Sequence, residues 1–146
     1  MQKPARQNAI ERAIGWERGM LALTKRAVFP ELSTTQGIAA AVGLPLALAK
    51  RNLRQWKDEG RIFSVEYKGT EYFPLFALDP RANFHPYPAV AEILSIFRDL
   101  SPLGIAAWFV GGNSFLDDQR PKDVLDVDPA WVIDAAKDEV AECQHG

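Results

Sequence analysis

The stretch Leu32–Ile62, LSTTQGIAAAVGLPLALAKRNLRQWKDEGRI, holds the strongest local signals in the chain. Near its start, Ser33 is followed three positions later by Gln36, which is the pattern of a capping box and predicts a short helix over 34–42. Gly43 follows, and glycine readily adopts the left-handed conformation in which many helices end. The first part of the stretch therefore predicts a short, well-delimited helix.

A second helix is predicted over 45–59, directly after that turn. Pro45 suits the first turn of a helix, and Gly60 suits the position after the last turn. Apolar side chains at helical spacing predict its inner face, which comprises Leu46, Ala49, Leu53 and Trp56.

Two β-rich runs, 62–67 and 71–76, follow the second helix and predict a hairpin. The connection between them, 68–70, contains a glycine that suits the positive φ of a tight turn. Pro74 has no backbone N–H, so the second run is expected at the edge of its sheet.

An apolar stripe before Pro30 predicts a further helix at the start of this region. The stripe comprises Trp16, Met20, Leu23 and Ala27. Three helices followed by a hairpin resemble a winged helix-turn-helix, whose hairpin is called the wing, over about residues 14–78. The resemblance implies a DNA-binding domain.

The charge of the chain is divided unevenly along its 146 residues. The net charge of -2 and the pI near 5.7 alone argue against nucleic acid. Residues 1–80, however, carry 12 Lys and Arg against 8 Asp and Glu, whereas 81–146 carry 5 against 11. A proline-rich segment, 79–88, lies at the change of sign. We therefore expect a mostly α protein of two small domains rather than one core, a winged helix-turn-helix at 1–80 and a small helical bundle at 81–146.

Basic side chains gather on one side of the predicted helix 45–59, opposite Leu53 and Trp56. A cationic face of this kind contacts DNA phosphates, although a plain solvated helix face is the alternative. The predicted DNA-binding residues lie on this helix, on the hairpin and at the start of the preceding helix: Lys50, Arg51, Asn52, Arg54, Gln55, Lys57, Arg61, Lys68, Thr34 and Thr35.

The first turn of the same helix is apolar, with Leu46, Ala47 and Leu48. Base edges are usually read by polar side chains at that position, and none of these three residues can donate a hydrogen bond to a base. Sequence-specific reading is left open. The apolar turn also suits a protein-interaction adaptor that does not bind DNA.

Helices are also predicted throughout the second half. One is expected over 89–100, and Ser101 is expected to cap the next, which Pro102 opens. A short turn follows over 120–125, and Asp128 is the expected cap of a last helix.

The string IAAWFVGGNSFLDDQRPKDVLDVDPAWVIDAA, Ile105–Ala136, resembles the toxin-binding domain of the Xre/MbcA/ParS antitoxins. The matching residues are Trp108, Asn113, Leu116, Arg120, Pro121, Val124, Leu125, Val132 and Ala136. Antitoxins of this family dimerise, bind their own promoter and block a RES-domain toxin that consumes NAD. The resemblance implies three partners, which are double-stranded DNA, a toxin protein encoded nearby and a second copy of the chain. The predicted partner-binding residues are four of these matching residues and the nearby acidic residue Asp123: Trp108, Asn113, Leu116, Arg120 and Asp123.

Other classes of function have little support in the sequence. The acidic residues of 117–128 do not follow a calcium-loop pattern, so no metal is expected, and no cofactor motif is present. His85 and His145 have no companion residues for catalysis, and enzyme activity is not expected. The single cysteine, Cys143, and the lack of a long apolar run favour a cytoplasmic protein without a membrane span.

The sequence therefore predicts a DNA-binding transcriptional regulator. Its most concrete form is an antitoxin that represses its own operon and neutralises a RES-domain-like toxin by direct binding. A standalone transcription factor without a toxin, and the adaptor described above, remain the alternatives.

Overall fold

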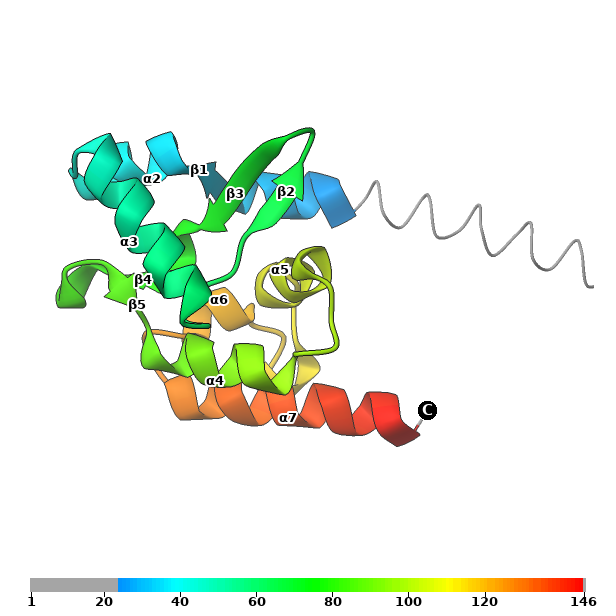
Figure 1. Ribbon diagram of the computed structural model, residues 1–146. Helices are drawn as coiled ribbons and strands as arrows, with labels where there is room; N and C mark the ends of the chain where they lie inside the picture. The colour runs from blue at the N-terminus through cyan, green and yellow to red at the C-terminus, as the bar shows by residue number, and fades with distance from the viewer. Residues whose placement is uncertain (1–23, 146) are drawn as a thin grey trace, which may run out of the picture.

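The structure is a computed structural model that describes residues 24–145. Figure 1 labels the α-helices and strands. Along the chain the elements are η1 Phe29–Glu31, β1 Leu32–Thr34, α2 Thr35–Val42, α3 Leu46–Asp58, β2 Val65–Tyr67, β3 Thr70–Pro74, η2 Leu75–Ala77, β4 Leu78–Asp79, η3 Pro80–Ala82, β5 His85–Pro86, α4 Pro88–Ile96, α5 Pro102–Val110, η4 Ser114–Leu116, α6 Pro121–Val124 and α7 Pro129–His145. Helices dominate, which confirms the prediction of a mostly α protein.

The first helix of the predicted motif is seen only at its end. Residues 24–28 are helical and run into η1, and the predicted stripe members Trp16, Met20 and Leu23 lie outside the described residues. Ala27 is exposed, whereas Val28 is completely buried. The predicted register of the stripe is therefore wrong at Ala27, because Val28 is the side chain that faces the core.

Helix α2 begins one residue later than predicted. The side-chain oxygen of Thr34 accepts a hydrogen bond from the backbone N–H of Gly37 at 3.1 Å, so Thr34 is the cap. Ser33 is not the cap: it lies one residue before Thr34 in β1, paired with Phe73. Gly43 ends the helix with a φ of 72°, as predicted.

Helix α3 lies where the sequence predicts it, with Gly60 at a φ of 72° just beyond it. Ala49, Leu53 and Trp56 are buried on its inner face. Leu46, however, is 39% exposed, so the prediction that it belongs to the inner face is wrong. The buried stripe begins one turn further along, because Leu46 is the first residue of the helix.

The hairpin belongs to a three-stranded antiparallel sheet with the order β1-β3-β2. Lys68 and Gly69 connect β2 to β3 with φ values of 49° and 77°, which fits the two-residue turn typical of hairpins. Strand β1 is unpredicted and pairs with the far side of β3, from Leu32↔Pro74 onward. The prediction that Pro74 places its strand at an edge is therefore wrong, and the proline is tolerated because it is the last residue of the central strand.

The predicted caps in the second half of the chain are present. Ser101 Oγ accepts a hydrogen bond from the N–H of Gly104 at 3.1 Å, and Asp128 Oδ1 accepts one from the N–H of Trp131 at 3.2 Å. The helices that these caps open, α5 and α7, pack with α4 and α6, and α4 lies alongside α7 (Figure 1).

The two halves of the chain share one core. A single cluster of buried apolar side chains extends from Val28 to Ala136. The ring of Phe109 in α5 packs against two rings from the first half of the chain. Its centroid lies 6.1 Å from that of Phe63 and 5.4 Å from that of Phe76. The expectation of a separate core in each half is therefore wrong, while the division of the sequence at residue 80 stays a prediction. Within residues 24–145, no helix has the length and apolar character that crossing a membrane requires.

Candidate nucleic-acid interface

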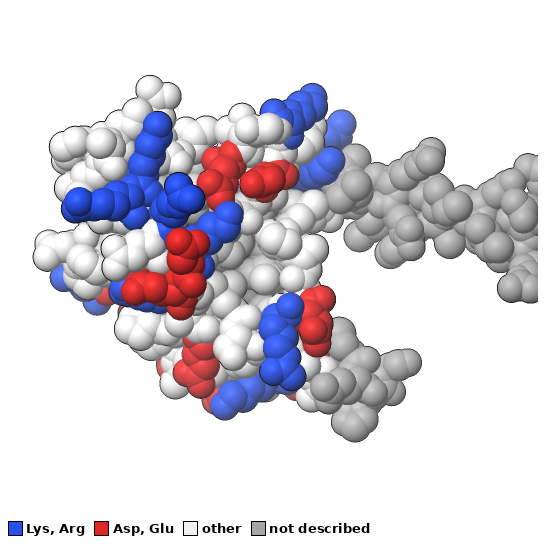
Figure 2. Space-filling view, in the orientation of Figure 1, with Lys and Arg blue, Asp and Glu red and all other residues white. Residues whose placement is uncertain are grey.

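Three basic side chains form an exposed cationic face on α3. Lys50, Arg51 and Arg54 are exposed, and none of them makes an ion pair with another described residue. Figure 2 shows Lys and Arg side chains gathered over this helix, with acidic side chains at its end and over the hairpin. We call Lys50, Arg51 and Arg54 the α3 cationic face.

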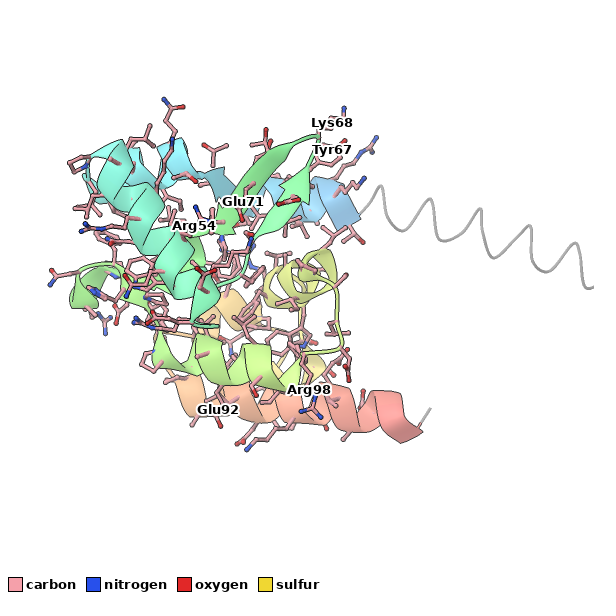
Figure 3. The ribbon with its side chains drawn as sticks, in the orientation of Figure 1. Arg54, Tyr67, Lys68, Glu71, Glu92 and Arg98 are labelled. Carbon is pink, nitrogen blue, oxygen red and sulfur yellow. The ribbon has the colours of Figure 1, made fainter. Side chains whose placement is uncertain are left out.

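A groove of about 470 Å³ separates α3 from the sheet. Its lining comes from α3, from β3 and from the first residue of α2: Thr35, Lys50, Leu53, Arg54, Lys57, Asp58, Glu71 and Phe73. Figure 3 shows Arg54 on α3 and Glu71 on the hairpin beside this groove. The structure thus brings residues of α3 that are predicted to bind DNA together with Thr35. The side-chain oxygen of Thr34, in contrast, accepts the capping hydrogen bond of α2.

Lys57 is paired, unlike its basic neighbours. Its Nζ donates to Glu71 Oε2 at 2.5 Å, and Ser64 Oγ donates to the same oxygen at 2.6 Å. Burial acts to raise the pKa of Glu71, but these two hydrogen bonds and the charges of Lys57 and Arg54 outweigh it and lower that pKa. The Glu71 carboxylate is therefore charged at neutral pH and cancels part of the positive charge of the groove.

Arg61 lies at the far end of α3 rather than in the groove. Its guanidinium is 3.5 Å from Glu59 and lies over the Trp56 ring at 5.9 Å. A partly exposed ion pair of this kind contributes little to the stability of the fold, but it directs the Arg61 guanidinium toward Glu59 and Trp56. Arg61 is thus separate from the α3 cationic face.

The other two polar residues predicted on α3 lie in different surroundings. Asn52 is half-buried and lines a small apolar pocket between α2, α3 and the segment 78–84, away from the groove. Gln55 is exposed one turn beyond Arg51. Of Asn52, Arg54 and Gln55, all predicted to bind DNA, Arg54 alone lines the groove.

The hairpin turn carries a second group of cations. Lys68 lies over the ring of Tyr67 at 5.3 Å, and Lys25 lies over the same ring at 4.7 Å. Phe29 packs against this ring at 5.0 Å, and Figure 3 shows Tyr67 and Lys68 at the end of the hairpin. Sequence reasoning missed Lys25 and Tyr67, because only the fold brings the first helix beside the hairpin.

Two of the predicted partner-binding residues lie in one cleft. Trp108 and Asn113 line a cleft of about 220 Å³ whose carboxylates come from α7: Asp138, Glu139 and Glu142. The indole Nε1 of Trp108 is buried and has no hydrogen-bond partner within the described part of the chain. Asn113 Oδ1 accepts from the N–H of Phe115 at 2.9 Å, a local hydrogen bond that is typical of asparagine in turns.

Leu116 is completely buried. Its side chain contributes to the core together with Val124 and Leu125, as their apolar character leads one to expect. The prediction that Leu116 contacts a partner is therefore wrong for this fold, because no part of its side chain reaches the surface.

Arg120 and Asp123 form an ion cluster that connects the two halves. Arg120 Nε donates to Asp123 Oδ2 at 2.8 Å, and both Arg120 and Lys122 reach Glu31 of η1, at 3.6 and 3.1 Å. Burial acts to raise the pKa of Asp123, but the hydrogen bond from Arg120 and the charge of Lys122 outweigh it and lower that pKa. Both predicted residues are thus engaged within the chain, away from the cleft of Trp108.

Among the described residues, no three His, Cys, Asp or Glu side chains are grouped so that they could hold a metal ion. Within the acidic segment 117–128, Asp123 pairs with Arg120 and Asp128 caps α7.

The comparisons with known proteins give one structural likeness. No protein-family model matches the chain, and no curated protein matches its sequence. The NMR structure of Rv2175c is similar in fold, with a TM-score of 0.58 and 18% sequence identity over 75% of this chain and 80% of that chain. At this level of identity the likeness concerns the fold alone.

Proposed function

We propose that the chain is a DNA-binding transcriptional regulator that holds duplex DNA against α3 and the β2–β3 hairpin. The observation that carries the proposal is the α3 cationic face, three exposed basic side chains without an ion pair in residues 24–145, beside a groove. Contacts from Lys and Arg to phosphates supply most of the affinity of such proteins for duplex. Two helices followed by a hairpin also fit the order expected of a winged helix-turn-helix, which supports the same function.

The decisive experiment measures binding of a fluorescent duplex by the full chain at increasing salt. The affinity should fall steeply between low and moderate salt, and the double variant Arg51→Glu/Arg54→Glu should lose binding. A matched control reverses two exposed charges far from α3, Arg98→Glu/Lys137→Glu, and should keep most of the affinity. The proposal fails if the parent does not bind at low salt, or if the α3 variant binds like the parent.

The most concrete form of this function is an antitoxin of the Xre/MbcA/ParS type, acting in the cytoplasm as a homodimer on its own operator. Its support is the resemblance of Ile105–Ala136 to the toxin-binding domain of that family. The excess of acidic residues in 81–146 fits a basic protein partner, because complementary charge steers such associations. The partner would be a RES-domain-like toxin encoded nearby, held at the cleft of Trp108 and Asn113.

The antitoxin form is tested by expressing the neighbouring reading frame alone and together with this chain. Growth should stop in the first case and recover in the second, and the two proteins should co-purify. Charge reversal at the cleft, Glu139→Lys/Glu142→Lys, should weaken the recovery. If the product of the neighbouring reading frame is not toxic and does not co-purify with this chain, the antitoxin form fails and a standalone transcription factor is the remaining form of the proposed function.

A protein-interaction adaptor is the second candidate, favoured by the exposed apolar start of α3. Leu46 is 39% exposed and Ala47 is exposed beside it. An adaptor would show no salt-dependent binding to duplex, and Leu46→Glu would abolish its protein contact while leaving the fold intact.

A further inference from the structure

The strand β3 places a carboxylate inside the groove that the proposed function assigns to DNA. Glu71 lines this groove together with Lys50, Arg54 and Lys57. A carboxylate is unexpected there, because it repels phosphate and competes with it for the same cations.

We infer that Glu71 is a positioning residue that holds Lys57 away from the DNA phosphates and thereby weakens binding to duplex; the inference rests on the proposed function. Lys57 Nζ and Ser64 Oγ both donate to Glu71 Oε2, at 2.5 and 2.6 Å. The Lys57 and Glu71 side chains remain 42% and 35% exposed. A phosphate oxygen can therefore reach the ammonium, but it competes there with the carboxylate, which repels it and holds the lysine toward the hairpin.

The position of the carboxylate is fixed before any ligand arrives. Ser64 is 6% exposed, so its hydroxyl donates from a buried site in the fold. This hydrogen bond helps to hold the Glu71 carboxylate toward Lys57 of α3. Arg54, which makes no such pair with a described residue, is left to bind phosphate.

Glu66 supplies a matched control for the charge of Glu71. It lies directly opposite Glu71 in the register of β2 and β3, and it is exposed. Both carboxylates repel phosphate, but within the described residues only Glu71 pairs with Lys57. Glu71→Gln and Glu66→Gln remove equal charge from neighbouring positions, and glutamine at 71 keeps an oxygen that accepts from Ser64.

The experiment measures duplex binding of the full-length parent across a salt series, together with the variants Glu71→Gln, Glu66→Gln, Lys57→Gln, Arg54→Gln and Lys57→Gln/Glu71→Gln. We expect Glu71→Gln to bind about fivefold more tightly than the parent, the upper range for a partly exposed ion pair. Its dependence of log affinity on log salt should steepen by about 0.9, the value for one added phosphate contact. Glu66→Gln should bind only slightly more tightly, without the steeper dependence.

Lys57→Gln gives an independent readout. Because Glu71 holds Lys57 in the parent, the Lys57→Gln variant should keep the salt dependence of the parent, whereas Arg54→Gln should reduce the slope by about 0.9. With Gln at 57, the effect of Glu71→Gln should shrink to that of Glu66→Gln. Circular dichroism of each variant confirms that it is folded.

The inference is overturned if the parent binds DNA but Glu71→Gln equals Glu66→Gln in affinity and slope, or if Lys57→Gln loses a full phosphate contact. The proposed function stands in both cases. If no variant binds duplex at low salt, the proposed function fails, and the inference fails with it.

Discussion

Phe63, just before β2, stacks on Phe109 of α5 with ring centroids 6.1 Å apart and planes 12° apart. Each ring is buried, and the two come from different halves of the chain. Aromatic contacts of this kind add to the burial of apolar area. The region that contains the α3 cationic face is thus held in place by the helices of the second half.

Phe109→Ala should therefore destabilise the whole chain and not only α5. We expect a loss of about 3–5 kcal/mol, the usual cost of removing a buried phenylalanine ring. Chemical denaturation followed by far-UV circular dichroism and by tryptophan fluorescence measures it, and the two curves should coincide. Phe115→Ala, at a residue 39% exposed, is the control and should cost much less. Two separated transitions in the parent would contradict a shared core.

The ion cluster of Arg120, Lys122, Asp123 and Glu31 gives stability a defined dependence on pH. The pKa of Asp123 is lowered in the fold, so its ion pairs stabilise the protein above the ordinary pKa of an aspartate and this stability is lost as the pH falls through the folded-state pKa. Asp123→Asn should be less stable than the parent at pH 7 by under about 1 kcal/mol, since both partners are partly exposed.

The gap between Asp123→Asn and the parent should narrow below about pH 4 and then close. Thermal unfolding at several pH values measures this gap. Asp126→Asn, which removes an exposed carboxylate outside the cluster, should show no comparable narrowing. A gap that stays constant down to pH 2 would show that Asp123 acts through packing and not through charge.

Thr34 is the cap of α2, and its loss should be measurable. Thr34→Ala removes the hydrogen bond from the N–H of Gly37 and should cost about 1 kcal/mol. Ser33→Ala tests the neighbouring residue, which lies in β1 and does not cap the helix, and should cost less. Equal losses in a denaturant titration would contradict the assignment of the cap.

Signals that act within a few residues were predictable from the sequence. Gly43, Gly60 and the Lys68-Gly69 turn were found because positive φ favours particular residue types. The predicted cap of α2 is wrong by one position, because both Ser33 and Thr34 carry a hydroxyl and only the residue at which the helix begins, with Thr34 accepting from the N–H of Gly37, decides between them.

Contacts between distant segments were not predictable in the same way. The helical spacing places Lys57 on the basic side of α3, but it contains no sign that Glu71 lies opposite. Strand β1 is not predicted by the sequence, because it is short and its partner β3 is far along the chain. The shared core depends likewise on side chains such as Phe63, whose partner Phe109 no local pattern identifies.

The hairpin turn offers a test of phosphate binding that does not involve α3. Lys68 lies at the turn, over the ring of Tyr67. If the hairpin contacts DNA as the proposed function requires, Lys68→Gln should weaken binding to all duplex sequences alike and reduce the salt slope by about one. Lys137→Gln removes the same charge from α7 and should leave the slope unchanged. An unchanged slope for Lys68→Gln, with α3 variants still defective, would show that DNA is held by the helix without the hairpin.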